Sequence, residues 1–111
     1  LQLSYNRVTE ESAEVDILEP DHPIFNSPNS ISSRDLENWV QEIGLYFPDE
    51  WADEFKPLLA AHDTGEEAKK GILLVADHGK GKFIYTGLSL FRQLPKGVPG
   101  AYRLLANLIA Y

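Results

Sequence analysis

The spacing of apolar positions changes along the chain, and each spacing predicts an element. Between residues 33 and 43 apolar side chains recur at i, i+3, i+4 and i+7, which predicts an amphipathic helix. These positions are Leu36, Trp39, Val40 and Ile43. A serine, Ser32 or Ser33, can cap the first-turn amides, and Gly44 suits the left-handed residue that ends a helix.

Four shorter segments have the composition of β-strands. Residues 71–76 form a continuous apolar run, which is typical of a strand buried on both faces. Residues 82–87 are rich in aromatic and β-branched side chains, and a turn with two glycines at 77–81 makes them the antiparallel partner of that run. Residues 15–18 and 58–61 predict two more short strands.

Pro99 opens a second predicted helix. Its expected buried face consists of Ala101, Leu104, Leu105, Leu108 and Ile109. Residues 24–29 and 45–57 are predicted as loops, the second because Pro57 would break a helix. The predicted order is therefore β-α-β-β-β-α, an α/β fold with a mixed sheet of about four strands and two helices. Residues 1–111 form one domain, or a fragment of one.

Composition removes several classes of protein. With 111 residues, 43% of them apolar, the chain can bury one modest core. The longest apolar run is far shorter than the roughly 18 residues of a membrane span. The absence of cysteine excludes disulfides, thiolate metal sites and a cysteine nucleophile. The chain does not begin with methionine, and we expect it to be part of a longer protein.

Charge is distributed unevenly along the sequence. Residues 1–67 hold 16 acidic and 3 basic side chains, whereas residues 68–111 hold 1 acidic and 7 basic ones, for a net charge of −7. An acidic chain is a poor candidate for nucleic-acid binding, which needs a dense basic face. We expect the two halves to lie against each other and to cancel part of their charge.

Three local patterns have both a structural and a functional interpretation. The sequence 79–81 (Gly-Lys-Gly) resembles part of a phosphate loop, but it joins two predicted strands and is predicted as a hairpin turn. The histidines fall in separate turns without metal-ligand spacing, so we expect exposed histidines and no metal site. They are His22, His62 and His78. Asp49, Glu50, Asp53 and Glu54 flank Trp51, and a solvated face is favoured over a glycosidase carboxylate pair.

The most informative polar pair is Arg92–Gln93, which follows a predicted buried strand. Ligands in α/β folds are usually held beyond strand ends. Alternatively, Arg92 pairs with a carboxylate of the acidic half and locks the loop at 90–97. The candidate ligand-binding residues are Arg92, Gln93, His22, Asn26 and Asn29.

Several phrases of the sequence resemble the tail of large bacterial PIG-L (LmbE-like) deacetylases. They are HPIFNSPN at 22–29, WVQE at 39–42, GLYFP at 44–48, GKGK at 79–82, YTGL at 85–88, FRQLP at 91–95 and GVPGAYRL at 97–104. The resemblance implies the C-terminal part of a class I glutamine-amidotransferase-like domain with a flavodoxin-like fold. It also implies a preceding zinc-dependent deacetylase domain that acts on N-acetylated sugars.

The chain departs from both parent activities. The zinc motif of the deacetylase, His-Pro-Asp-Asp, is absent, because His22 and Pro23 are followed by Ile24. The amidotransferase needs a cysteine nucleophile, which this chain lacks. Its His-Pro-Glu segment is matched only in part, by His-Pro-Ile at 22–24. No catalytic residue or cofactor is therefore assigned here, and zinc is expected only in the separate deacetylase domain.

These observations predict a non-catalytic accessory domain that serves docking, substrate binding or assembly. The expected partner is the rest of the parent chain, with carbohydrate and a second copy as open alternatives; neither nucleic acid nor membrane is expected. The alternative is a small-molecule or carbohydrate module around Arg92 and Gln93, or a residual hydrolase. The sequence itself does not give the compartment, and the resemblance alone favours a periplasmic or exported location. An accessory domain should tie these polar side chains to backbone groups, whereas a binding site should converge them on an open cleft.

Overall fold

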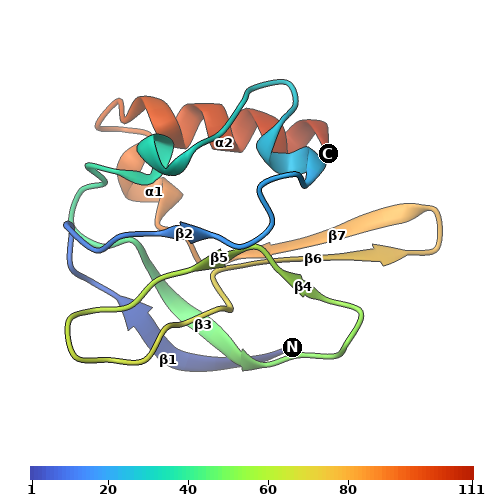
Figure 1. Ribbon diagram of the computed structural model, residues 1–111, viewed down its shortest axis with the longest axis horizontal. Coiled ribbons are helices and arrows are strands. Elements are labelled where there is room, and N and C mark those ends of the chain that lie inside the picture. Colours follow the sequence, from blue (N-terminus) through green and yellow to red (C-terminus); the bar gives the residue numbers. More distant parts are fainter.

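The computed structural model describes residues 1–111 apart from the side chain of His78. The strands are β1 (Gln2–Val8), β2 (Asp16–Ile17), β3 (Gly44–Glu50), β4 (Lys56–Pro57), β5 (Leu59–Ala60), β6 (Leu73–His78) and β7 (Gly81–Thr86). The helices are the 3-10 turns η1 (Pro23–Phe25) and η2 (Ser33–Leu36), the short α1 (Leu90–Gln93) and α2 (Pro99–Ala110). In Figure 1 the helical elements lie on one side of the strands, with α2 outermost.

The strands form three small antiparallel sheets, in the orders β1-β3, β2-β5 and β4-β6-β7. The fold is thus a compact α/β arrangement of several antiparallel sheets and two α-helices. The prediction of one mixed sheet of about four strands is wrong. Of the three strands that the sequence pattern missed, β4 is only two residues long, and β1 and β3 carry exposed apolar residues such as Leu3 and Tyr46.

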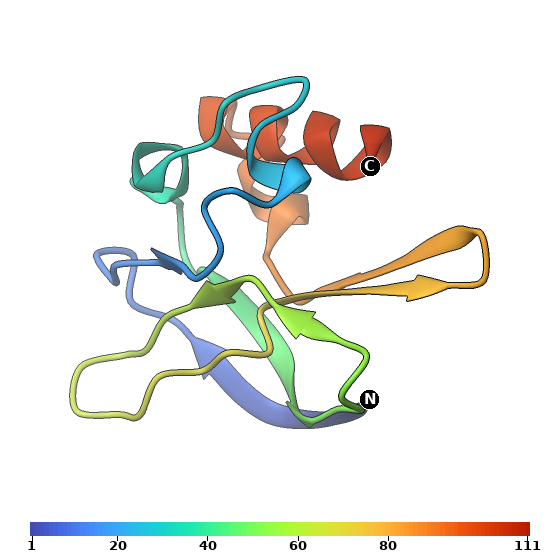
Figure 2. The same cartoon turned by 45° about the vertical axis from the view of Figure 1, so that its right-hand side comes forward.

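The β6–β7 hairpin confirms the prediction for this region. Its register pairs Leu73 with Thr86 and Val75 with Ile84, and the turn uses Gly79 at φ 57°. The apolar run is buried from Ile72 to Val75, while the rest of the hairpin projects beyond the core (Figure 2). The short strands predicted near 15–18 and 58–61 are present as β2 and β5.

The predicted helix at 33–43 is wrong. Only the turn η2 forms, held by a capping box between Ser32 and Asp35, and the chain then leaves helical geometry. Asn38 and Gln41 have positive φ values of 62° and 64°, which an α-helix cannot contain. Leu36, Trp39 and Ile43 are nevertheless buried, so the apolar stripe marks core contacts made by an irregular segment. Gly44, expected to end that helix, instead begins β3.

Gly44 belongs to a close contact between strands. A Cβ at this position would lie 2.4 Å from the carbonyl oxygen of Gly87, so only glycine fits. The contact allows Leu45 N–H to donate to Gly87 O at 3.0 Å. The loop predicted at 45–57 was therefore wrong in its first part, which continues as β3.

The helix predicted at Pro99 is confirmed as α2, but the prediction of its buried face is only partly correct. Ala101 and Leu104 are buried, Leu105 and Leu108 are half-buried, and Ile109 is 78% exposed. Asn107, which was not assigned to the core, is fully buried. No helix among the described residues is both long and apolar enough to cross a membrane.

Candidate functional site

Gln93 fixes the irregular segment that replaces the predicted helix. Its fully buried side chain accepts from Val40 N–H at 2.7 Å and donates to Val40 O at 3.0 Å. It also donates to Glu42 O at 3.3 Å. One amide side chain thus satisfies backbone groups that a continuous helix would have paired internally. Residues 90–93, predicted as loop, form the short helix α1 that positions this side chain.

Arg92 pairs with a carboxylate of the acidic half. Its Nε donates to the Glu42 carboxylate, which is mostly buried, and its guanidinium lies 4.9 Å from the ring of the exposed Phe91. The prediction that Arg92 pairs within the protein is confirmed. Arg103 makes the corresponding contact with Asp35 at 2.9 Å, so two ion pairs join the basic and acidic halves.

The other candidate residues surround η1. His22 caps η1, its Nδ1 accepting from Ile24 N–H at 3.2 Å. Asn26 Nδ2 donates to Pro20 O and His22 O, both at 2.9 Å. Asn29 donates from its backbone N–H to Asn107 Oδ1 at 2.9 Å and from Nδ2 to Arg103 O at 3.3 Å.

The five candidates therefore form two separate groups. Arg92 and Gln93 hold the segment at 40–42, whereas the other three hold the chain around η1 and α2. No hydrogen bond in the described structure joins the two groups. Each group is bonded mainly to backbone, which is the arrangement expected of an accessory domain. Ligand binding at these residues stays a prediction.

Two important polar residues were not predicted from the sequence. Asn107 donates through Nδ2 to Ile24 O at 2.6 Å and to Asn29 O at 2.8 Å, which clamps the 24–29 loop onto α2. Its position three residues after Leu104, on the apolar face of α2, is the signal that could have identified it.

Asp63 is the second such residue. Its carboxylate is buried and accepts from the backbone of Thr9 and Glu10, both at 2.8 Å, from the Thr9 hydroxyl, and from Arg7. Burial alone would raise the pKa of Asp63, but the hydrogen bonds from Glu10 and Thr9, with the Arg7 charge, hold that pKa below its usual value. The turn after β5 is thereby fastened to the end of β1.

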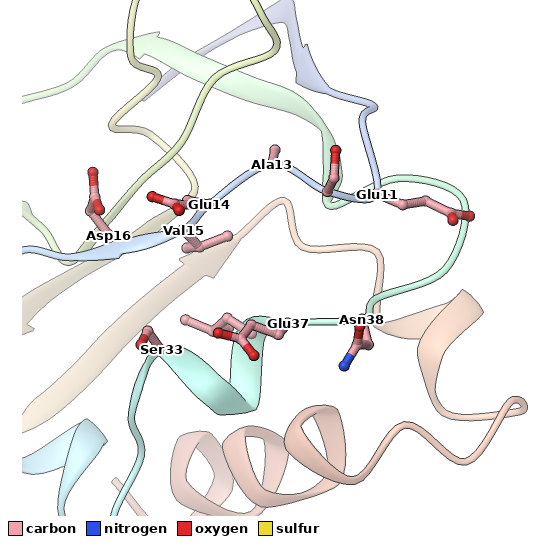
Figure 3. Close-up of a pocket in the computed structure, with 10 residues that line it drawn as sticks. Glu11, Ala13, Glu14, Val15, Asp16, Ser33, Glu37 and Asn38 are labelled. Carbon is pink, nitrogen blue, oxygen red and sulfur yellow. The ribbon is translucent and has the colours of Figure 1, made fainter.

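An open cavity of about 450 Å³ lies between residues 11–16 and 33–38 (Figure 3). Four of the ten residues that line it are acidic: Glu11, Glu14, Asp16 and Glu37. None of the five candidates lines it. Among the described side chains, no three His, Cys, Asp or Glu converge in a way that could hold a metal ion.

The remaining motifs are the Gly-Lys-Gly sequence, the acidic residues around Trp51 and the histidines. The Gly-Lys-Gly sequence forms a hairpin turn, and the four acidic residues around Trp51, Asp49, Glu50, Asp53 and Glu54, are exposed. His62 is exposed, with Nδ1 2.9 Å from Asp63 O, whereas His22 is half-buried rather than exposed. The expectation for the His78 side chain lies outside the described residues.

Two exposed apolar faces remain. The outer face of α2 presents Tyr102, 51% exposed, with Ala106, Ile109 and Ala110 at helical spacing behind it. The outer face of β1 and β3 presents Leu3, Tyr46 and the 91% exposed Tyr5, whose ring centroid lies 6.2 Å from that of Tyr46. Exposed apolar residues that gather on one face are candidates for an interaction surface.

No protein-family model, curated protein or solved structure matches this chain.

Proposed function

We propose that this chain is a non-catalytic accessory domain that docks onto the rest of a larger protein through the outer face of α2. The observation that carries the proposal is the lack of charge on that face. Arg103 is the only charged residue among the 12 of α2, and it is turned toward Asp35 and Ser30. A helix that is apolar on both faces is normally buried on both.

The size of this face supports a partner within the same chain. A helix of 12 residues is about 18 Å long, and one face of it covers less than the roughly 800 Å² per partner of a stable complex between free proteins. A covalent connection compensates for a small interface because it keeps the two surfaces at high effective concentration. The proposed occupant is therefore an apolar surface of a neighbouring domain in the same chain.

The resemblance to PIG-L (LmbE-like) proteins supplies the proposed neighbour, a zinc-dependent deacetylase domain for N-acetylated sugars. The neighbouring domain and the accessory role are taken from this resemblance. Its flavodoxin-like fold is not included, because such a fold has a parallel sheet and every strand pairing described here is antiparallel. The coding sequence upstream of Leu1 tests this part directly, since a reading frame without a His-Pro-Asp-Asp motif would overturn it.

The activity test uses the 111-residue chain alone. We expect no release of acetate from N-acetylglucosamine derivatives with added zinc, and no hydrolysis of glutamine. Zinc-dependent acetate release by this chain would overturn the assignment as non-catalytic and favour the residual hydrolase. A different result would favour the carbohydrate module. In that case the isolated chain binds sugar, and Arg92→Ala abolishes this binding without changing the melting temperature.

The docking test uses the longer chain that contains both domains. Ile109→Glu places a carboxylate on the outer face of α2, and we expect it to lower the melting temperature of this domain in the longer chain but not in isolation. Tyr5→Glu is the matched control, because it alters the other exposed apolar face. If Tyr5→Glu lowered this melting temperature and Ile109→Glu did not, the docking surface would be the outer face of β1 and β3.

A further inference from the structure

His22 lies where the first turn of η1, the β6–β7 hairpin and the end of α2 meet. Its Nδ1 accepts from Ile24 N–H at 3.2 Å, and its ring centroid lies 5.2 Å from that of Tyr111. A cavity of about 110 Å³ beside it is open to solvent and is also lined by Glu54, Lys56 and Asp77. Protons can therefore reach the ring without any movement of the backbone.

The hydrogen bond to Ile24 requires one particular form of the imidazole. Nδ1 can accept only when it carries no proton, so the neutral ring must hold its proton on Nε2. In the imidazolium form Nδ1 is itself a donor and faces another donor. Protonation of His22 is thus incompatible with the cap of η1 as the structure shows it.

We propose that His22 is a pH-sensitive latch, whose neutral ring holds the first turn of η1 and whose protonation releases that turn and loosens the loop clamped onto α2. The turn is connected to α2 because Asn107 donates to Ile24 O at 2.6 Å. Ile24 and Phe25 are buried and keep the loop in the core, so the opening is local rather than global.

The charged groups around His22 come from each element packed against it. Partial burial of the ring has the largest effect on the pKa of His22 and lowers it from its usual value. Lys56 of β4 and Lys82 of β7 lower it further, whereas Glu19 before η1 and Asp77 of β6 raise it. Because the folded chain favours the neutral ring, the latch is closed at neutral pH and opens as the pH falls below the ordinary histidine range.

The test needs first the unaltered protein, observed by NMR between pH 8 and pH 4.5. The ¹⁵N shifts of the His22 ring should show a proton on Nε2 at neutral pH. The amide signal of Ile24 should titrate with the same midpoint as His22, and its protection from hydrogen exchange, corrected for the intrinsic rate, should fall roughly fivefold, as for a lost N-cap. A neutral ring protonated on Nδ1, or an Ile24 amide that does not follow His22, would overturn the proposal.

Two variants complete the experiment. His22→Asn keeps a capping acceptor that does not titrate in this range, so the Ile24 amide should stay protected at every pH. His22→Ala removes the acceptor, and protection should be low throughout. His62→Asn is the control variant, because replacement of this exposed histidine should leave the pH dependence of the Ile24 amide unchanged. A pH-dependent Ile24 amide in His22→Asn would assign the effect to another group and reject the latch.

Discussion

Replacement of Asn107 by Leu tests how the 24–29 loop is held to α2. The side chains are nearly equal in size, so the change removes hydrogen bonds without opening a large cavity. Three backbone groups lose their partners, the carbonyl oxygens of Ile24 and Asn29 and the N–H of Asn29. Each buried group left unpaired costs about 1–3 kcal/mol. Burial of the added apolar surface offsets about 1–2 kcal/mol.

The middle of these ranges gives an expected loss of about 4–5 kcal/mol, a large part of the stability of a small domain. Urea unfolding followed by tryptophan fluorescence measures it, because Trp39 is buried. Asn26→Leu is the matched control. Asn26 also bonds two carbonyls, but it is exposed, and water can replace those bonds at a cost below about 1 kcal/mol. Equal stabilities of Asn107→Leu and the control would refute the clamp.

Three further predictions concern single residues. Asp63→Asn should lower the stability at pH 7 by about 2 kcal/mol, because it replaces an ionised acceptor of several hydrogen bonds. Since the folded pKa of Asp63 is lowered, its contribution is present above the unfolded pKa of about 4 and is lost as the pH falls through the folded value. The free energy of unfolding, measured in urea between pH 3 and pH 7, should thus vary less with pH in Asp63→Asn than in the unaltered chain. An equal pH dependence of the two proteins would contradict this role of Asp63. Arg92→Ala should lower stability by at most about 1 kcal/mol in a thermal melt, because its pair with Glu42 is partly exposed, and sugar titrations should not change. Trp39→Ala should cost about 3–5 kcal/mol through the cavity it leaves, and an unchanged melting temperature would show that the core is misplaced.

The part of the fold that could be predicted depends on local signals. The β6–β7 hairpin and α2 were predicted because two glycines, a continuous apolar run and a proline mark their ends within a few residues. The apolar spacing at 33–43 predicted the buried residues Leu36, Trp39 and Ile43 but not their conformation. The conformation depends on Gln93, some 50 residues away, and a one-dimensional pattern contains no such information.

The same limit applies to the polar residues. The pairing of Arg92 with the acidic half could be predicted from charge alone, although its partner Glu42 could not. Asp63 bonds to backbone groups far away in the sequence, so composition and spacing do not identify it. Spacing places Asn107 on the apolar face of α2, but it does not identify the distant backbone groups that Asn107 bonds. The exposure of Ile109 was missed for a different reason. Its residue type and spacing fit a buried face, and only the packing in space shows that α2 has two apolar faces.

The measurement that tests the docking claim most directly uses a cysteine reporter on α2. The chain has no cysteine, so Ala106→Cys introduces one thiol in the middle of the exposed outer face. Lys80→Cys, in the exposed β6–β7 turn, is the control. Maleimide labelling is followed by peptide mass spectrometry in the isolated chain and in the longer chain with its neighbouring domain. We predict that position 106 reacts at least tenfold more slowly in the longer chain while position 80 reacts equally in both. Equal rates at position 106 in the two chains would contradict docking through α2.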